Sequence, residues 1–247
     1  MKTFSITDVG KIRQLNQDFI FTSETPVGKL PNLFIVADGM GGHNAGDYAS
    51  RFTVETVVEQ IRNSVEIKTA QIIKKAIEEA NRLLLERAGE EERLSGMGTT
   101  LVLCTIKGKE ACIANVGDSR LYIVNEEIHQ ITKDHSLVEE MVRMGELEPE
   151  SARIHPNKNV ITRAIGANEE VTIDFFDIVL KVNDTILMCS DGLTNMVEDE
   201  DIKIIIDRQR DVIEKAESLI HAANDNGGED NIAVIIIEPF SDEVKEC

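Results

Sequence analysis

The chain has 247 residues, of which 42% are hydrophobic and 29% charged, and this composition excludes a largely disordered protein. Because 45 acidic residues face only 26 basic ones, the formal charge is −19, and an acidic surface excludes nucleic acid as the main ligand. The beginning of the chain lacks an apolar signal region, and no apolar run approaches the ~18 residues of a membrane span. We therefore expect a cytoplasmic protein without a membrane segment, and the acidic surface favours a monomer.

The first third of the chain predicts three strands followed by two helices. The strand patterns cover residues 3–8, 19–22 and 33–37, and the last is a continuous apolar run typical of a buried strand. Apolar residues then recur with helical spacing over residues 45–61 and again over 73–84. Charged residues fill the other face of the second helix, which should therefore lie at the surface.

The rest of the chain predicts short strands, one long irregular segment and three further helices. Strands are expected over 99–106, 111–116, 121–124, 128–132, 172–179, 185–189 and 232–237. Helices are expected over 137–143, 199–207 and 212–223. Residues 145–166 carry two prolines and no period, and a loop of that length is usually functional or mobile. The pattern predicts one α+β domain over residues 1–247, with antiparallel sheets covered by helix pairs.

The four cysteines contain no C-x-x-C pair, which favours buried thiols in a reducing compartment over a disulfide framework. They stand at positions 104, 112, 189 and 247, and the first three lie inside apolar runs. A bridge between Cys104 and Cys112 across a hairpin is the alternative.

Four aspartates stand at the ends of predicted strands or in the turns between them. Asp38 and Asp191 each follow a buried strand and precede glycine, Asp118 occupies a turn, and Asp230 precedes the last strand. An Asp-Gly pair is most often only a turn, because Asp bonds its own backbone and Gly allows positive φ. Strand ends of neighbouring sheets gather at one rim, however, so these carboxylates can meet there.

Clustered carboxylates without a thiolate or imidazole favour the hard cations Mg²⁺, Mn²⁺ and Ca²⁺. The five histidines show no zinc-binding spacing, and no EF-hand sequence is present. Near the N-terminus, Arg13 stands five residues before Asp18, and its planar guanidinium could hold a phosphoryl group if it reaches the carboxylates. An ordinary surface arginine is the alternative.

Six short motifs occur in the order found in the metal-dependent, type 2C protein phosphatases. They are Arg13-x-x-Asn16-Gln17-Asp18, Val36-Ala37-Asp38-Gly39-Met40-Gly41-Gly42-His43, Gly96-Met97-Gly98-Thr99-Thr100, Asn115-Val116-Gly117-Asp118-Ser119-Arg120, Cys189-Ser190-Asp191-Gly192-Leu193 and Glu229-Asp230-Asn231. The chain resembles a bacterial, single-domain member of this family over residues 3–238. The resemblance implies a central antiparallel β-sandwich flanked by helix pairs on both faces, with residues 145–166 as a flap beside the active site.

The same resemblance implies a centre of two Mn²⁺ or Mg²⁺ ions and a third, weaker ion. Asp38 would bridge the two ions, the Gly39 carbonyl would bind one of them, and Asp191 and Asp230 would complete the other. Asp18 would support the site through a bound water, and Asp118 with Asp191 would hold the third ion. Arg13 would bind the substrate phosphate.

The implied activity is hydrolysis of phosphoserine and phosphothreonine in proteins by a metal-bridging hydroxide, without a serine or cysteine nucleophile. The implied partners are a bacterial Ser/Thr kinase and its substrates. Animal members carry a histidine directly after the Asp-Gly pair as a proposed general acid, whereas Met40 stands here. His43 is the nearest candidate for that role, and a purely structural loop histidine is the alternative. Two other readings of the whole chain are a regulatory pseudophosphatase and a phosphohydrolase of small phosphoesters.

Overall fold

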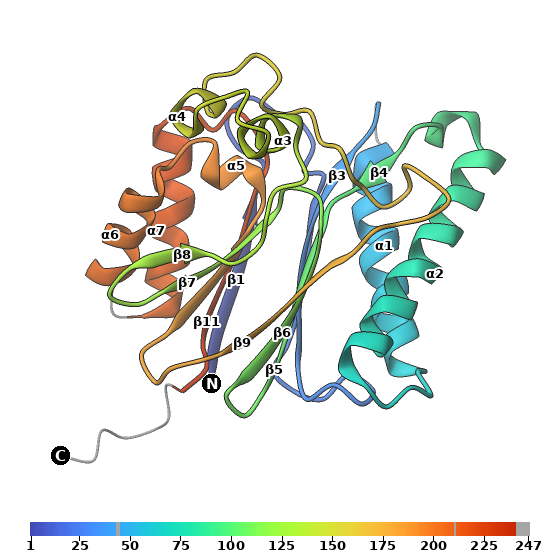
Figure 1. Ribbon diagram of the computed structural model, residues 1–247, viewed down its shortest axis with the longest axis horizontal. Coiled ribbons are helices and arrows are strands. Elements are labelled where there is room, and N and C mark those ends of the chain that lie inside the picture. Colours follow the sequence, from blue (N-terminus) through green and yellow to red (C-terminus); the bar gives the residue numbers. More distant parts are fainter. Residues whose placement is uncertain (43–44, 210, 241–247) are drawn as a thin grey trace.

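Two antiparallel β-sheets packed face to face form the centre of the computed structural model, which describes residues 1–42, 45–209 and 211–240 (Figure 1). The first sheet has the order β1 (Lys2–Asp8), β11 (Ile232–Glu238), β10 (Thr185–Cys189), β7 (Arg120–Val124) and β8 (Ile128–Gln130). The second sheet has the order β2 (Asp18–Ser23), β3 (Leu33–Met40), β5 (Leu101–Lys107), β6 (Glu110–Val116) and β9 (Asp174–Val179), and the two-residue β4 (Gly98–Thr99) pairs with the end of β3.

Helix pairs cover the outer faces of both sheets, giving four layers (Figure 1). The second sheet is covered by α1 (Ala45–Arg62) and α2 (Thr69–Glu90), and the first by α6 (Asp199–Arg208) and α7 (Val212–Asp225). The shorter helices are η1 (Glu92–Leu94), α3 (Leu137–Arg143), α4 (Pro149–Ala152) and α5 (Asp191–Thr194).

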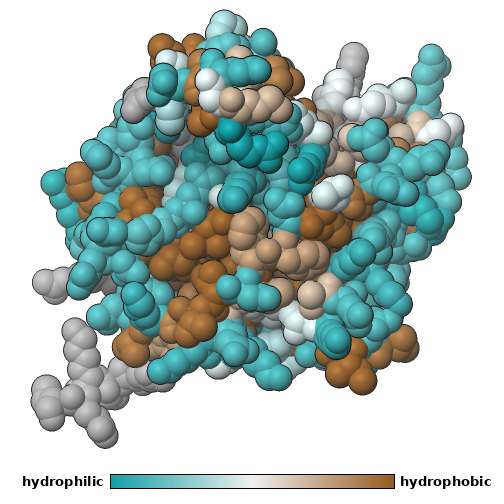
Figure 2. All heavy atoms as spheres, in the orientation of Figure 1, coloured by the Kyte–Doolittle hydropathy of each residue, from teal (hydrophilic) through white to brown (hydrophobic). Residues whose placement is uncertain are grey.

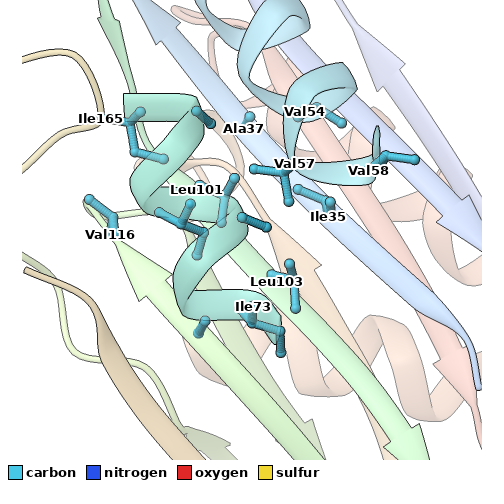
Figure 3. Close-up of a cluster of buried hydrophobic side chains, with 14 of the residues drawn as sticks. Ile35, Ala37, Val54, Val57, Val58, Ile73, Leu101, Leu103, Val116 and Ile165 are labelled. Atoms are coloured by element: carbon cyan, nitrogen blue, oxygen red, sulfur yellow. The ribbon is translucent and has the colours of Figure 1, made fainter. Parts of the chain in front are cut away.

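The central strands are apolar throughout because both of their faces are buried. In β3, Phe34 and Val36 point into the space between the sheets, whereas Ile35 and Ala37 point toward the helices. Figure 3 shows Val57 of α1 lying over Ile35, beside Ala37. Since side chains alternate along a strand, one continuous apolar run supplies two separate cores.

The fold confirms the predicted α+β sandwich with helices on both faces. The predicted helix 137–143 and strand 185–189 match α3 and β10 residue for residue. One difference concerns β3, which continues past the predicted end at residue 37 to Met40, because β4 pairs with Gly39 and Met40. The long segment 145–166 contains one short helix, α4.

Cys104, Cys112 and Cys189 are free thiols, so the alternative bridge between Cys104 and Cys112 is absent. In the register of β5 and β6, Cys112 lies opposite Thr105, the residue next to Cys104. Adjacent residues of a strand point to opposite faces, so the two thiols lie on different sides of the sheet.

The face drawn in Figure 2 is largely hydrophilic at its periphery, with an apolar patch across its middle, where Figure 1 draws β9 and the β7–β8 hairpin. Strands β8 and β9 are edge strands, so the partly exposed residues near them lie at the side of the sandwich. Among the described residues, no helix combines the length and the apolarity that crossing a bilayer requires.

Candidate active site

A polar pocket of about 230 Å³ opens at one end of the sandwich and brings together residues from far apart in the chain. It is lined by Arg13, Gln17, Asp38, Gly39, Met40, Gly41, Thr100, Asp118, Asn159, Ile161, Asp191, Asp230 and Asn231. Six of the predicted site residues are therefore in its wall, and the seventh, Asp18, lies directly behind it as the partner of Asp38. His43, the candidate general acid, lies outside the described residues.

Asp18 and Asp38 are direct cross-strand partners in the register of β2 and β3. Like charges directly opposite one another on antiparallel strands are destabilising. Asp38 lies within β3 rather than after its end, because the pairing of Gly39 with Thr99 prolongs the strand. Two carboxylates on facing strands therefore need positive charge or a shared proton between them.

Asp18 is buried, with only one of its two carboxylate oxygens engaged. Ser190 donates its hydroxyl to Oδ2 at 2.6 Å, whereas Oδ1 is buried without a hydrogen-bond partner. Asp191, the first residue of α5, repeats this arrangement. Asn195, one helical turn later, donates to its Oδ2 at 2.9 Å, and its Oδ1 has no partner. An unpaired buried carboxylate oxygen is costly, and such exceptions call for a ligand.

Arg13 reaches the pocket and pairs with Asp230, with 2.8 Å between Nη2 and Oδ2. The guanidinium is half-exposed, so it keeps N–H groups that can bind a ligand in the pocket. Asn231 fixes the loop that carries Arg13. Its amide group donates to the carbonyls of Val9 and Leu15 at 2.9 and 3.0 Å.

Asp118 is buried in the turn between β6 and β7, and hydroxyl groups tie this turn to β3. Ser119 Oγ lies 2.7 Å from Thr100 Oγ1, and Thr100 Oγ1 accepts the backbone N–H of Asp38 at 3.0 Å. The turn and the strand therefore keep a fixed separation.

Burial and neighbouring carboxylates raise the pKa values of Asp18, Asp38, Asp118 and Asp191. Burial raises the pKa of Asp38 well above its ordinary value, and Asp18, Asp191, Asp118 and Asp230 each raise it further. Burial also raises the pKa of Asp118 and of Asp191, with additional contributions from Asp191 and Asp230 respectively. Because all four other carboxylates act on Asp38, it is the electrostatic centre of the cluster. A divalent cation reverses such shifts by stabilising the ionised forms.

The donors in this pocket fit hard divalent cations. They are oxygens only, and two carboxylate oxygens, on Asp18 and Asp191, are buried without a partner. In the described part of the chain, no group of three or more His, Cys, Asp or Glu side chains is placed so that it could hold a metal ion by itself. A Mg²⁺ or Mn²⁺ ion in this pocket would therefore need water or backbone oxygens to complete its coordination, and Mg²⁺ commonly keeps several water ligands and uses few carboxylates.

Two glycines allow the close backbone contacts on which the site depends. A Cβ atom at Gly39 would lie 2.0 Å from the carbonyl oxygen of Gly46, in the first turn of α1. A Cβ atom at Gly192 would lie 1.9 Å from the carbonyl oxygen of Asn231. Any other residue at either position would displace backbone that carries a site residue.

Several residues that support the site had no predicted role. Asn195 could have been found from its i, i+4 spacing to Asp191, and Ser190 and Asn231 stand next to predicted aspartates in the motifs. Asn159 and Ile161 line the pocket from the long 145–166 segment, and no local pattern marks them.

Comparison with known proteins gives three consistent matches. The model of the family described as protein phosphatase 2C matches residues 11–233. The serine/threonine phosphatase stp of Listeria innocua is 43% identical over 239 residues, covering 94% of this chain and 93% of that protein. The solved structure of the Streptococcus agalactiae serine/threonine phosphatase superposes with a TM-score of 0.88 at 39% identity, covering 95% and 98% of the two chains.

A further solved structure bears on the cations. The catalytic domain of the serine/threonine protein phosphatase PstP, solved in complex with two manganese ions, has a TM-score of 0.83 and 30% identity. The match covers 95% of this chain and 96% of that domain.

Proposed function

The chain belongs to the protein phosphatase 2C family and is a metal-dependent protein serine/threonine phosphatase, and we propose that the aspartate pocket at the end of the sandwich is its active site. The observation that carries this proposal is the pair of buried, unpartnered carboxylate oxygens on Asp18, the cross-strand partner of Asp38, and on Asp191, which lines the pocket that Arg13 reaches.

In this proposal, Asp38, Asp191, Asp230 and the Gly39 carbonyl hold two Mn²⁺ or Mg²⁺ ions. When bound, the ions supply an acidified water as nucleophile and positive charge for the phosphoryl oxygens. Asp18 acts from behind Asp38, where its pairing with Ser190 leaves one oxygen free for a bound water.

Asp118 and Asp191 would hold a third, weaker ion. Both carboxylates also line a smaller pocket of about 90 Å³ next to the first, together with residues of the 145–166 segment. Burial and the neighbouring Asp191 raise the pKa of Asp118, so a cation there would relieve the repulsion between the two groups.

Arg13 would bind the phosphate of the substrate. Its bond to Asp230 orients the guanidinium before a substrate arrives, so less side-chain entropy is lost on binding. Asn159 and Ile161, from the proposed flap of residues 145–166, line the same pocket and would lie beside a bound phosphoprotein. A bacterial Ser/Thr kinase and its targets are the proposed source of substrates.

Hydrolysis of a phosphothreonine peptide with Mn²⁺, with and without EDTA, tests the proposal. Asp38→Asn removes the central carboxylate charge and should lower kcat by about 100-fold or more, since ligand loss is more severe than the 10–100-fold typical of supporting residues. Asp207→Asn, on the exposed end of α6, is the matched control and should leave the rate unchanged. Activity that survives EDTA, or that persists in Asp38→Asn, would contradict the proposed site.

A further inference from the structure

His135 lies between β8 and α3, is only 5% exposed, and has both ring nitrogens engaged. The backbone N–H of Gly117 donates to Nδ1 at 3.0 Å. Because that donor fixes a lone pair on Nδ1, the neutral ring carries its proton on Nε2, which donates to Asp174 Oδ2 at 3.1 Å. Burial lowers the pKa of His135, which favours this neutral form.

His135 and Asn115 both form hydrogen bonds to Gly117 in the turn that carries Asp118. The backbone N–H of His135 donates to the carbonyl of Gly117 at 3.0 Å, so His135 pairs both backbone groups of that residue. Asn115 donates to the same carbonyl at 3.2 Å. Gly117 has φ +106°, and a Cβ atom there would lie 2.6 Å from Thr100. The position of Asp118 therefore depends on His135.

His135 also binds the end of the 145–166 segment. Its carbonyl accepts the backbone N–H of Thr162 at 2.7 Å, and the next residue, Ser136, forms a β-bridge with Ile161. Arg163 donates to Asp174 Oδ1 at 3.1 Å. Arg163 Nη1 also lies 3.2 Å from His135 Nε2. Both atoms are donors, and they lie close together because each bonds to the Asp174 carboxylate.

We propose that His135 is a positioning residue that couples residues 159–163, at the wall of the pocket, to the Asp118 turn. The inference rests on the proposed function in one respect, namely that Asp118 lies in the metal site. The Nδ1 bond holds the turn, and the Nε2 bond holds the 159–163 segment through Asp174 and Arg163. Each ring nitrogen therefore stabilises one of the two coupled segments, the Asp118 turn or residues 159–163.

A pair of substitutions separates the two bonds. In His135→Asn, the side-chain oxygen replaces Nδ1 as acceptor for Gly117 but does not reach Asp174. In His135→Gln, the amide nitrogen replaces Nε2 as donor to Asp174, and the acceptor for Gly117 is lost. His129→Gln is the control, because the imidazole ring of His129 in β8 is exposed.

Amide hydrogen exchange in the presence of EDTA, detected by mass spectrometry, measures the protection of residues 117–119 and 159–163. This measurement does not depend on enzymatic activity. His135→Gln should speed exchange at residues 117–119, and in kinetic assays it should raise the Mn²⁺ concentration for half-maximal activity about 10-fold. His135→Asn should leave residues 117–119 protected, speed exchange at 159–163, and raise KM for a phosphopeptide more than it lowers kcat.

The proposal is overturned if both variants loosen both segments equally together with a uniform loss of thermal stability, or if neither changes exchange. Should the histidine variants fail to fold, Asp174→Ala removes the acceptor of the His135 Nε2 bond. It should reproduce the exchange pattern expected for His135→Asn. A wild-type protein without phosphatase activity would contradict the proposed function, whereas the exchange pattern tests the coupling by itself.

Discussion

Ser190 donates its hydroxyl to Asp18 across the two sheets, with 2.6 Å between Oγ and Oδ2. The two residues are 172 positions apart in the chain. The same hydroxyl oxygen accepts the backbone N–H of Ala233 at 2.9 Å, so one side chain joins β2, the end of β10 and β11. This contact fixes the spacing of the two sheets at the point where the carboxylates converge.

Ser190→Ala should lower the free energy of unfolding by about 1–3 kcal/mol, because it leaves the Ala233 N–H and Asp18 Oδ2 buried without partners. Urea denaturation in EDTA measures the change apart from any effect of cations. Ser23→Ala is the control, since that exposed hydroxyl bonds to Thr25 at the outer end of β2. Equal losses in the two variants would contradict the role given to Ser190.

Stability in the absence of divalent cations should depend on pH through the aspartate cluster. Burial raises the pKa of Asp18 from 3.8 to about 8, against the Ser190 hydrogen bond, which lowers it. Because the folded state binds this proton more tightly than the unfolded chain, the stabilisation is complete below pH 3.8 and is lost as pH rises through about 8.

The free energy of unfolding in EDTA should therefore fall between about pH 5 and about pH 8, by up to about 1.4 kcal/mol per pH unit for each proton. Asp18→Asn should flatten the profile, and saturating Mn²⁺ should also flatten it because the cation replaces the proton. A profile that rises over this range in EDTA would show that these carboxyls are ionised in the folded chain.

The order and type of the elements could be predicted because local periodicity encodes them. Helix 137–143 is an example of such local information. It begins after Ser136, whose hydroxyl accepts the N–H of Glu139, and this N-cap depends on residues that are neighbours in the sequence. Asp38, Asp191 and Asp230 could likewise be found, since each adjoins an apolar strand. Contacts that depend on sheet register and packing could not be predicted. Examples are the pairing of Asp18 with Asp38 across β2 and β3 and the hydrogen bond from Ser190 to Asp18.

Gly192→Ala should abolish activity and strongly destabilise the protein, because a Cβ atom there would lie 1.9 Å from the backbone carbonyl of Asn231. That carbonyl cannot move without shifting Asp230. Gly89→Ala is the matched control, since it also lies in a helix but has open space around a Cβ atom. Gly89→Ala should stabilise α2 by up to about 1 kcal/mol. Thermal melts and phosphopeptide assays of both variants decide the matter, and similar behaviour of the two would refute the steric argument.

Arg13→Lys should weaken the binding of phosphate groups while leaving the fold intact. Lysine keeps the positive charge but loses the planar fork that bonds Asp230 and that would bind a phosphoryl group in the proposed site. Loss of one charged hydrogen bond costs about 1.5–3 kcal/mol, so KM for a phosphopeptide and the inhibition constant of inorganic phosphate should both rise about 10-fold or more.

The control for Arg13→Lys is Arg87→Lys on the exposed face of α2, where the arginine pairs with Glu90, away from the pocket. It should leave both constants unchanged. Asp230→Asn provides a second comparison, because it releases Arg13 and also removes a proposed cation ligand, so it should lower kcat as well as raise KM. If Arg13→Lys lowers kcat with phosphate inhibition unaltered, the arginine orients Asp230 and does not hold the substrate.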